Sequence, residues 1–124
     1  DLDLFKHVND HYGHAVGDHM LQHVSRIMRN DLRRVDSIGR IGGEEFSILM
    51  PDTDVHAAAI FAERLRGRIE ATPLQDNDHS IPITISIGIT QIGANDSSPE
   101  NVFERADLAL YRAKNSGRNR LELG

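Results

Sequence analysis

In the stretch Arg40-Ile41-Gly42-Gly43-Glu44-Glu45-Phe46, two glycines precede two adjacent carboxylates. The segments on either side, 37–41 and 46–50, have the composition of short strands, so the stretch predicts a tight β-hairpin with negative charge at its tip. Glycine lets the backbone approach a bulky polyanion closely, and carboxylate oxygens are the ligands that Mg²⁺ prefers. The hairpin is therefore a candidate site for phosphate chemistry. These residues alone leave a solvated acidic turn open as the alternative.

Periodic patterns of apolar residues continue on both sides of this hairpin. Before it, apolar residues at helical spacing predict an amphipathic helix from Ala15 to about Leu32. After it, the patterns predict a helix from Asp54 to about Ala71, a strand with alternating isoleucines from Ile83 to Ile89, a helix from Ser98 to about Asn115 and a short strand from Arg120 to Leu123. The polar segment from Pro73 to Ser80 is expected to form turns. This order indicates an α+β fold with the helices mainly on one face of a sheet.

Composition limits the class of protein. With 124 residues the chain is expected to form one domain, 1–124, and it has no run of about 18 apolar residues that could span a membrane. A formal net charge of −5 argues against a nucleic acid partner held by electrostatic attraction, although a small nucleotide carried by Mg²⁺ is compatible with it. The absence of cysteine excludes disulfides and zinc thiolate sites and fits a reducing cytosol. We therefore expect a cytoplasmic domain that makes no membrane contact.

Further motifs follow one another along the chain. They are Asp1-Leu2-Asp3-Leu4-Phe5-Lys6, Asn9-Asp10, Tyr12-Gly13-His14-Ala15-Val16-Gly17-Asp18, Pro51-Asp52-Thr53, Thr84-Ile85-Ser86-Ile87-Gly88-Ile89 and Tyr111-Arg112-Ala113-Lys114-Asn115-Ser116-Gly117-Arg118-Asn119. Together with the stretch from Gly42 to Phe46, they give a chain that resembles the GGDEF family of diguanylate cyclases over nearly its full length, in the GGEEF variant of the signature. The resemblance implies a ferredoxin-like palm, related to that of nucleotide cyclases and polymerases, with a central mostly antiparallel sheet and flanking helices.

The resemblance also concerns what precedes the sequence. The family's domain is longer, and its N-terminal helix and most of its first strand would lie before Asp1, so we expect an N-terminally truncated domain. An upstream sensory or dimerisation domain is expected in the intact protein, which could be anchored in a membrane with this domain on the cytoplasmic side.

The reaction that the resemblance implies is the condensation of two GTP molecules into cyclic di-GMP, with release of two pyrophosphates, across a homodimer. When the family's roles are transferred by matched position, Asp1 and Glu44 bind Mg²⁺ through their side chains and Leu2 binds it through its carbonyl. Mn²⁺ is the alternative ion. Glu45 is a second metal ligand or helps to deprotonate the attacking 3′-hydroxyl. The division of roles between Glu44 and Glu45 stays open.

Phosphate-binding groups are assigned in the same way. Phe5 and Lys6 would begin a short helix whose unpaired N–H groups favour phosphate, and the Lys6 ammonium adds a full positive charge to the reaction site. Lys114 and Arg118 are four residues apart at the end of the last helix, so we expect them on one side of it, where they clamp the same phosphate chain. A solvated basic helix end is the plainer alternative for these two residues.

The remaining substrate contacts concern the guanine base and the hairpin tip. Asn9 and Asp18 match the family's guanine readers, because a carboxylate accepts from guanine N–H groups and an amide both donates and accepts. Taken alone, Asn9 would be an ordinary capping residue. His14 is either adjacent to the nucleotide or orients the loop between Asn9 and Asp18. Gly42 and Gly43 complete the expected substrate-binding set.

A regulatory site is also implied. Arg33 and Asp36 form an Arg-x-x-Asp motif before Gly42 at the spacing of the family's product-inhibition motif, and Arg64 aligns with an auxiliary arginine of the same site. Arginine can stack on guanine and hydrogen-bond to it, and aspartate can accept from it, so we expect allosteric binding of cyclic di-GMP at Arg33, Asp36 and Arg64.

Other functions are weighed against this interpretation. A catalytically silent receptor for GTP or cyclic di-GMP is the first alternative, although intact Asp1, Glu44 and Glu45 argue against it. A palm-type polymerase would need a basic template groove, which the acidic net charge disfavours. A scaffold module would bind no nucleotide. His19 and His23 have the spacing of a helical metal pair, but no third ligand follows at a suitable spacing, so we interpret them as exposed helix residues.

Overall fold

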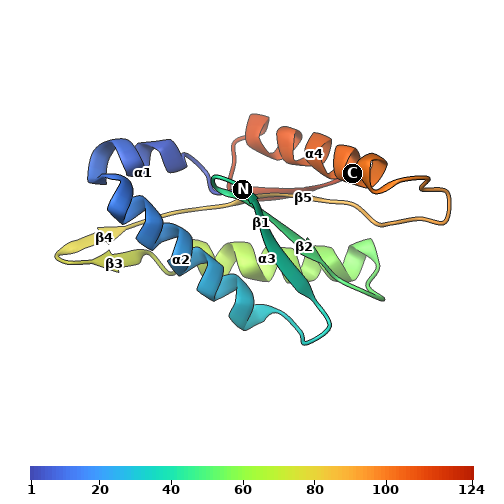
Figure 1. Ribbon diagram of the computed structural model, residues 1–124, viewed down its shortest axis with the longest axis horizontal. Coiled ribbons are helices and arrows are strands. Elements are labelled where there is room, and N and C mark those ends of the chain that lie inside the picture. The colour runs from blue at the N-terminus through green and yellow to red at the C-terminus, as the bar shows by residue number, and fades with distance from the viewer.

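The computed structural model describes residues 1–124. The helices are α1 (Phe5–Tyr12), α2 (His14–Asp31), α3 (Val55–Glu70) and α4 (Pro99–Asn115), and the strands are β1 (Ser37–Gly42), β2 (Glu45–Leu49), β3 (Leu74–Asp76), β4 (His79–Ile81), β5 (Ser86–Ile89) and β6 (Arg120–Leu123) (Figure 1). No helix combines the length and the hydropathy that crossing a membrane would need.

The longer predicted helices are confirmed, and local signals explain where they begin. The Asp54 side chain accepts from the Ala57 N–H over 2.8 Å at the start of α3. Ser98 caps α4 by accepting from the Asn101 N–H, and Pro99 occupies the first turn. These are the polar caps and the N-terminal proline that favour helix initiation.

The segment from Pro73 to Ser80 contains more structure than the expected turns. β3 and β4 pair antiparallel with Leu74 opposite Ile81, and Asn77 has a positive φ of 53° in the turn between them. Each strand has three residues, which are too few for an alternating pattern to show in the sequence.

The chain start connects two strand pairs. β1 and β2 pair antiparallel, whereas β5 and β6 pair parallel, with Ser86 opposite Arg120. Leu2 forms an antiparallel bridge to Ile85, just before β5, and its N–H donates to the Glu44 carbonyl at the β1–β2 turn. The first residues therefore lie between β5 and the tip of the β1–β2 hairpin (Figure 1).

The helices lie on both faces of β5, which corrects the expectation of one main face. Ile83 and Ile85 belong to the buried core formed with α2 and α3, where Met20 and Leu65 are almost completely inaccessible. Alternate residues point the other way, and Gly88 lies directly against the backbone of α4. In Figure 1, α4 and α3 accordingly flank β5 from opposite sides.

We predict that Gly88→Ala lowers the free energy of unfolding by about 1–3 kcal/mol, because overpacking against a rigid neighbour is costly. The added Cβ would lie 2.2 Å from the Ala106 carbonyl oxygen and 2.5 Å from the Leu110 nitrogen, and neither backbone atom can move freely. Gly67→Ala in α3 is the control, because its Cβ would meet nothing within 4 Å, and it should stabilise the fold by about 0.5–1 kcal/mol. Urea unfolding measures both, and wild-type stability of Gly88→Ala would contradict this packing.

Candidate functional site

The glycine turn between β1 and β2 lies beside the chain start. The Leu2 N–H donates to the Glu44 carbonyl over 3.2 Å. At the turn the strand register shifts between Arg40 and Gly42, and the Arg40 guanidinium donates to the Gly43 carbonyl over 2.8 Å. A Cβ at Gly42 or Gly43 would meet open space, so the backbone of the tip is accessible to a ligand.

The Asp1 carboxylate is the most enclosed acid at this junction. Its side chain is 8% exposed and forms an ion pair with the Lys114 ammonium through Oδ2. The other oxygen, Oδ1, is buried and has no hydrogen-bond partner. A buried carboxylate oxygen without a partner is costly unless a proton donor or a cation reaches it, so this atom suits a metal ligand.

The expected metal ligands Asp1, Glu44 and Glu45 belong to the same junction, but their side chains do not surround one common position. Glu44 and Glu45 are half-buried, and the Glu44 carbonyl oxygen lies 3.2 Å from the nitrogen of Leu2, the residue after Asp1. No three acidic or histidine side chains are grouped in a way that could hold a metal ion. The Lys114 ammonium forms an ion pair with the Asp1 carboxylate in this structure.

The start of α1 leaves its N-terminal amides without a side-chain cap. Leu4 precedes the helix in a left-handed conformation, with φ 55°, and no side chain caps the first turn. Phe5 is buried in the core and anchors this turn, whereas Lys6 is exposed. The helix start thus presents uncapped amide donors next to the exposed ammonium of Lys6.

Asn9 of α1 lies against α2 at Gly17, the residue before Asp18, because the two helices pack tightly. A Cβ at Gly17 would lie 1.8 Å from Asn9 Oδ1, so only glycine lets the Asn9 amide rest against α2 at this position. Asp18, the next residue, is exposed and lines an open groove of about 730 Å³ between α2 and the arms of the hairpin, to which Arg40 and Phe46 also contribute. This volume is in the range of small-molecule sites. His14 is exposed at the beginning of α2.

Lys114 and Arg118 do not lie on one side of a helix, which corrects the sequence prediction. α4 ends at Asn115, and Gly117 and Arg118 have positive φ angles of 123° and 63°. The spacing of four residues therefore has no helical meaning here. Lys114 contacts Asp1, whereas the Arg118 side chain is exposed and has no ion pair.

The Arg-x-x-Asp motif forms a closed local pair. Arg33 Nη2 lies 2.9 Å from Asp36 Oδ1 and also donates to the Pro51 carbonyl and to Thr53 Oγ1. A hydrogen bond from Arg33 keeps the pKa of Asp36 below its ordinary value, and the same bond raises the pKa of Arg33. Arg64 is exposed, with its guanidinium carbon 5.7 Å from the centre of the Phe61 ring.

His19 and His23 both bind the segment that leads into and forms β3. His19 Nδ1 lies 2.9 Å from Asp76 Oδ1, and His23 Nε2 lies 2.7 Å from the Thr72 carbonyl oxygen. The two histidines therefore connect α2 to this segment.

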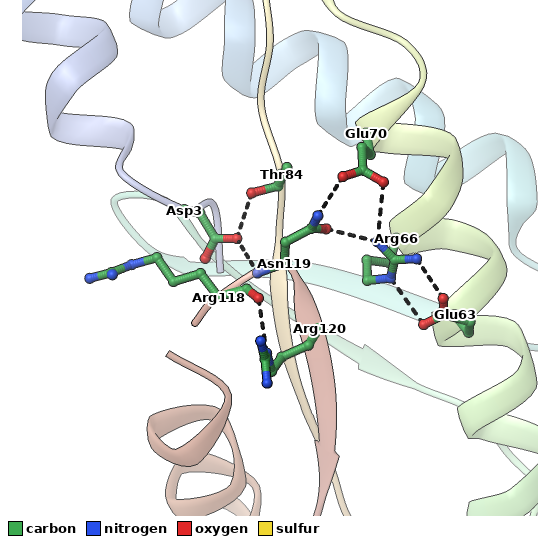
Figure 2. Close-up of polar contacts among 8 residues, drawn as sticks. All are labelled: Asp3, Glu63, Arg66, Glu70, Thr84, Arg118, Asn119 and Arg120. Carbon is green, nitrogen blue, oxygen red and sulfur yellow. Dashed lines mark hydrogen bonds and ion pairs between the residues drawn. The ribbon is translucent and has the colours of Figure 1, made fainter. Parts of the chain in front are cut away.

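Two polar residues of the junction, Asp3 and Asn119, were not among the site residues predicted from the sequence. Asp3 is 6% exposed, and its carboxylate accepts from Thr84 Oγ1 over 2.7 Å, from Ser86 Oγ over 2.6 Å and from the Asn119 N–H over 2.9 Å. Figure 2 shows Asn119 between Asp3 and the Arg66–Glu70 pair of α3. The alternation of Thr84 and Ser86 with buried isoleucines was a usable signal, because it predicts a polar strand face that needs a partner.

Comparisons with known proteins agree with this fold. The family profile described as "Diguanylate cyclase, GGDEF domain" matches residues 1–120. Diguanylate cyclase DgcP of Pseudomonas aeruginosa is 47% identical over 123 residues, which are 99% of this chain and 18% of DgcP. The chain thus corresponds to a part of that longer protein.

Two solved structures have the same fold. The coiled coil and GGDEF domain of DgcB from Caulobacter crescentus, in complex with c-di-GMP, has a TM-score of 0.93 and 30% identity, covering 100% of this chain and 66% of that one. The active GGEEF domain of a diguanylate cyclase from Vibrio cholerae has a TM-score of 0.89 and 33% identity, covering 99% of this chain and 78% of that one. Since the family profile spans nearly all residues, the chain belongs to the GGDEF family of diguanylate cyclase domains.

Proposed function

We propose that the protein containing this chain condenses two GTP molecules into cyclic di-GMP. The observation that carries the proposal is the junction of chain start and hairpin tip, where Leu2 N and the Glu44 carbonyl oxygen are 3.2 Å apart and Asp1 Oδ1 is buried without a partner. The similarity to DgcP, and to a GGEEF domain described as active, supports the same function.

The proposed reaction consists of two phosphoryl transfers. In each, the 3′-hydroxyl oxygen of one GTP forms a bond to the α-phosphorus of the other, and the bond from that phosphorus to the pyrophosphate oxygen breaks. The hydroxyl proton passes to a carboxylate of the hairpin tip, Glu44 or Glu45. Alignment of the two reacting groups and neutralisation of the phosphate charge supply most of the acceleration in reactions of this kind.

In this proposal Asp1, Glu44 and the Leu2 carbonyl hold a divalent cation, Mg²⁺ or Mn²⁺, with Glu45 as a further oxygen ligand. When bound, the cation neutralises phosphate charge and lowers the pKa of the attacking hydroxyl. The donor set is all oxygen, as Mg²⁺ requires, and the unpartnered Asp1 Oδ1 gives it one ready ligand.

The phosphate chain would lie between the start of α1 and the end of α4. The uncapped amides near Phe5 and the exposed Lys6 ammonium offer donors on one side. Lys114, whose side chain is 37% exposed, can turn from Asp1 to a phosphate, and Arg118 has a free guanidinium. These positive groups would stabilise the departing pyrophosphate.

The guanine base would bind near Asn9 and Asp18, at the groove beside α2. The Asp18 carboxylate accepts from guanine N–H groups, while the Asn9 amide both donates and accepts. His14, on the next turn before Asp18, would lie beside the nucleotide. Adenine lacks the paired donors that Asp18 would bind, so the site should prefer GTP to ATP.

A homodimer follows from the chemistry, because each domain would hold one GTP and the product has two-fold symmetry. The intact protein would place this domain in the cytoplasm and control its pairing through an upstream sensory or dimerisation domain.

Arg33, Asp36 and Arg64 would bind cyclic di-GMP as a feedback inhibitor. A catalytically silent receptor is not favoured, because the acids at the junction are all present.

We predict that Glu44→Gln lowers cyclic di-GMP synthesis by about 100-fold or more, because the amide is a poor metal ligand and a poor base. The assay incubates the whole protein with GTP and Mg²⁺ and measures cyclic di-GMP. Glu104→Gln, the same charge change on an exposed residue of α4, is the control and should keep wild-type activity. Retained synthesis in Glu44→Gln would remove Glu44 from the mechanism.

We predict that Arg33→Ala weakens binding of cyclic di-GMP about tenfold or more, because it removes both the guanidinium and the partner that fixes Asp36. The initial rate of synthesis should stay within about twofold, since Arg33 is not part of the proposed reaction site. Titration with cyclic di-GMP measures the affinity, with Arg34→Ala, the adjacent exposed arginine, as control. Unchanged product affinity in Arg33→Ala would refute feedback binding at this motif.

A further inference from the structure

The segment after α4 has an unusual backbone conformation. Gly117, Arg118 and Asn119 have consecutive positive φ angles of 123°, 63° and 47°. Asparagine tolerates this region, but arginine has no such preference, so the surroundings must hold Arg118 in it. The Arg118 N–H donates to the Ala113 carbonyl over 3.0 Å, which fastens the segment to the last turn of α4.

Asn119 fastens the other end of the segment to the chain start. Its N–H donates to Asp3 Oδ2 over 2.9 Å. Asp3 is itself buried and held by Thr84 and by Ser86 of β5, so it is a fixed acceptor. The backbone at Asn119 is thus tied to the residue that follows Asp1 and Leu2 directly.

Both the oxygen and the nitrogen of the Asn119 side-chain amide form hydrogen bonds with α3. Oδ1 accepts from Arg66 Nη1 over 2.8 Å, and Nδ2 donates to Glu70 Oε2 over 2.5 Å. Arg66 is held on its other side by Glu63, with Nη2 and Oε1 2.5 Å apart. Figure 2 shows this arrangement, in which Asn119 lies between Asp3 and the α3 pair while the Arg118 side chain extends to the opposite side, away from Arg66.

Arg118 is therefore directed by its neighbours rather than by its own contacts. Its guanidinium makes no ion pair or hydrogen bond. Its N–H donates to the Ala113 carbonyl, its own carbonyl accepts from Arg120 Nε over 3.1 Å, and the next residue, Asn119, is held by its bonds to Asp3 and α3. If the amide of Asn119 lost its hold on α3, the left-handed conformation of Arg118 would lose a support on which its direction depends.

We propose that Asn119 is a positioning residue that directs Arg118 toward the triphosphate by bridging Asp3 and the Arg66–Glu70 pair. The inference rests on the proposed function, because it assigns Arg118 to the phosphates of GTP. It adds a specific claim: the hydrogen bond between Asn119 and Glu70 sets the affinity for phosphate and leaves the affinity for guanosine unchanged.

A reciprocal exchange tests the bond directly. Asn119→Asp sets a carboxylate against Glu70, so the bond is lost and two like charges face each other. Adding Glu70→Gln restores a donor and an acceptor with their roles reversed, and the double variant has the net charge of the wild type. Adding Glu63→Gln instead is the matched control, because Glu63 contacts Arg66 but not Asn119.

The whole protein is titrated with guanosine and with a GTP analogue that carries a methylene group between its α- and β-phosphorus. Asn119→Asp should weaken binding of the analogue about tenfold, the loss of one charge-assisted contact, and should leave guanosine binding unchanged. Asn119→Asp with Glu70→Gln should restore wild-type affinity to within about twofold, whereas Asn119→Asp with Glu63→Gln should not. Asn119→Gly keeps the positive φ and the backbone N–H but lacks the side-chain amide, so it should lose affinity like Asn119→Asp. It is a second variant that tests the same bond should Asn119→Asp fail to fold.

Hydrogen exchange of the amides at 117–120 without nucleotide gives an independent measurement. Exchange should be faster in Asn119→Asp and should return to the wild-type rate only with Glu70→Gln. Equal analogue affinity in wild type and Asn119→Asp, or rescue by Glu63→Gln as well, would overturn the positioning role and leave the proposed function standing. A wild-type protein that binds neither the analogue nor GTP would overturn the proposed function itself, whatever the exchange rates show.

Discussion

The short backbone connection around Leu2 is the constraint on which the rest of the site depends. The Leu2 N–H reaches the Glu44 carbonyl over 3.2 Å, and the next residue, Asp3, donates its N–H to the Thr84 carbonyl over 2.9 Å. One dipeptide thus joins the hairpin tip to the strand that leads into β5, and α1 begins two residues later at Phe5. The candidate metal ligands and the candidate phosphate donors are consequently placed by the same few hydrogen bonds.

The negative charges of Asp1 and Asp3 are stabilised by different groups. This difference indicates a structural role for Asp3 and a ligand-binding role for Asp1. Asp3 has three donors and is fully satisfied, so it serves as an anchor. The Asp1 carboxylate has an ion pair with Lys114 through Oδ2, and its other oxygen, Oδ1, has no partner. A buried carboxylate in this condition is electrostatically incomplete, which is the state expected of a group that also takes a cation. Asn119 links the two parts, because it holds Asp3 while its neighbour Arg118 stays unpaired.

Sequence patterns predicted the local structure better than the long-range contacts. The hairpin around Gly42, the helices that begin near Asp54 and Ser98 and the isoleucine strand all depend on residues close together in the chain, so periodicity and turn chemistry were sufficient. The hydrogen bond from Asn119 to Asp3 joins residues 116 positions apart, and no local pattern announces it. The predicted helical pairing of Lys114 with Arg118 was wrong for a different reason, because α4 ends at Asn115, before Arg118.

The most direct test of the account is a crystal structure of the whole protein with Mg²⁺ and a GTP analogue that cannot transfer its α-phosphorus. We predict one Mg²⁺ with an Asp1 carboxylate oxygen and a Glu44 carboxylate oxygen both at about 2.1 Å, in contact with the phosphates of the analogue. The Lys114 ammonium should have moved from Asp1 to a phosphate oxygen. An analogue whose phosphates lie away from the hairpin tip, with Asp1 still paired to Lys114, would contradict it.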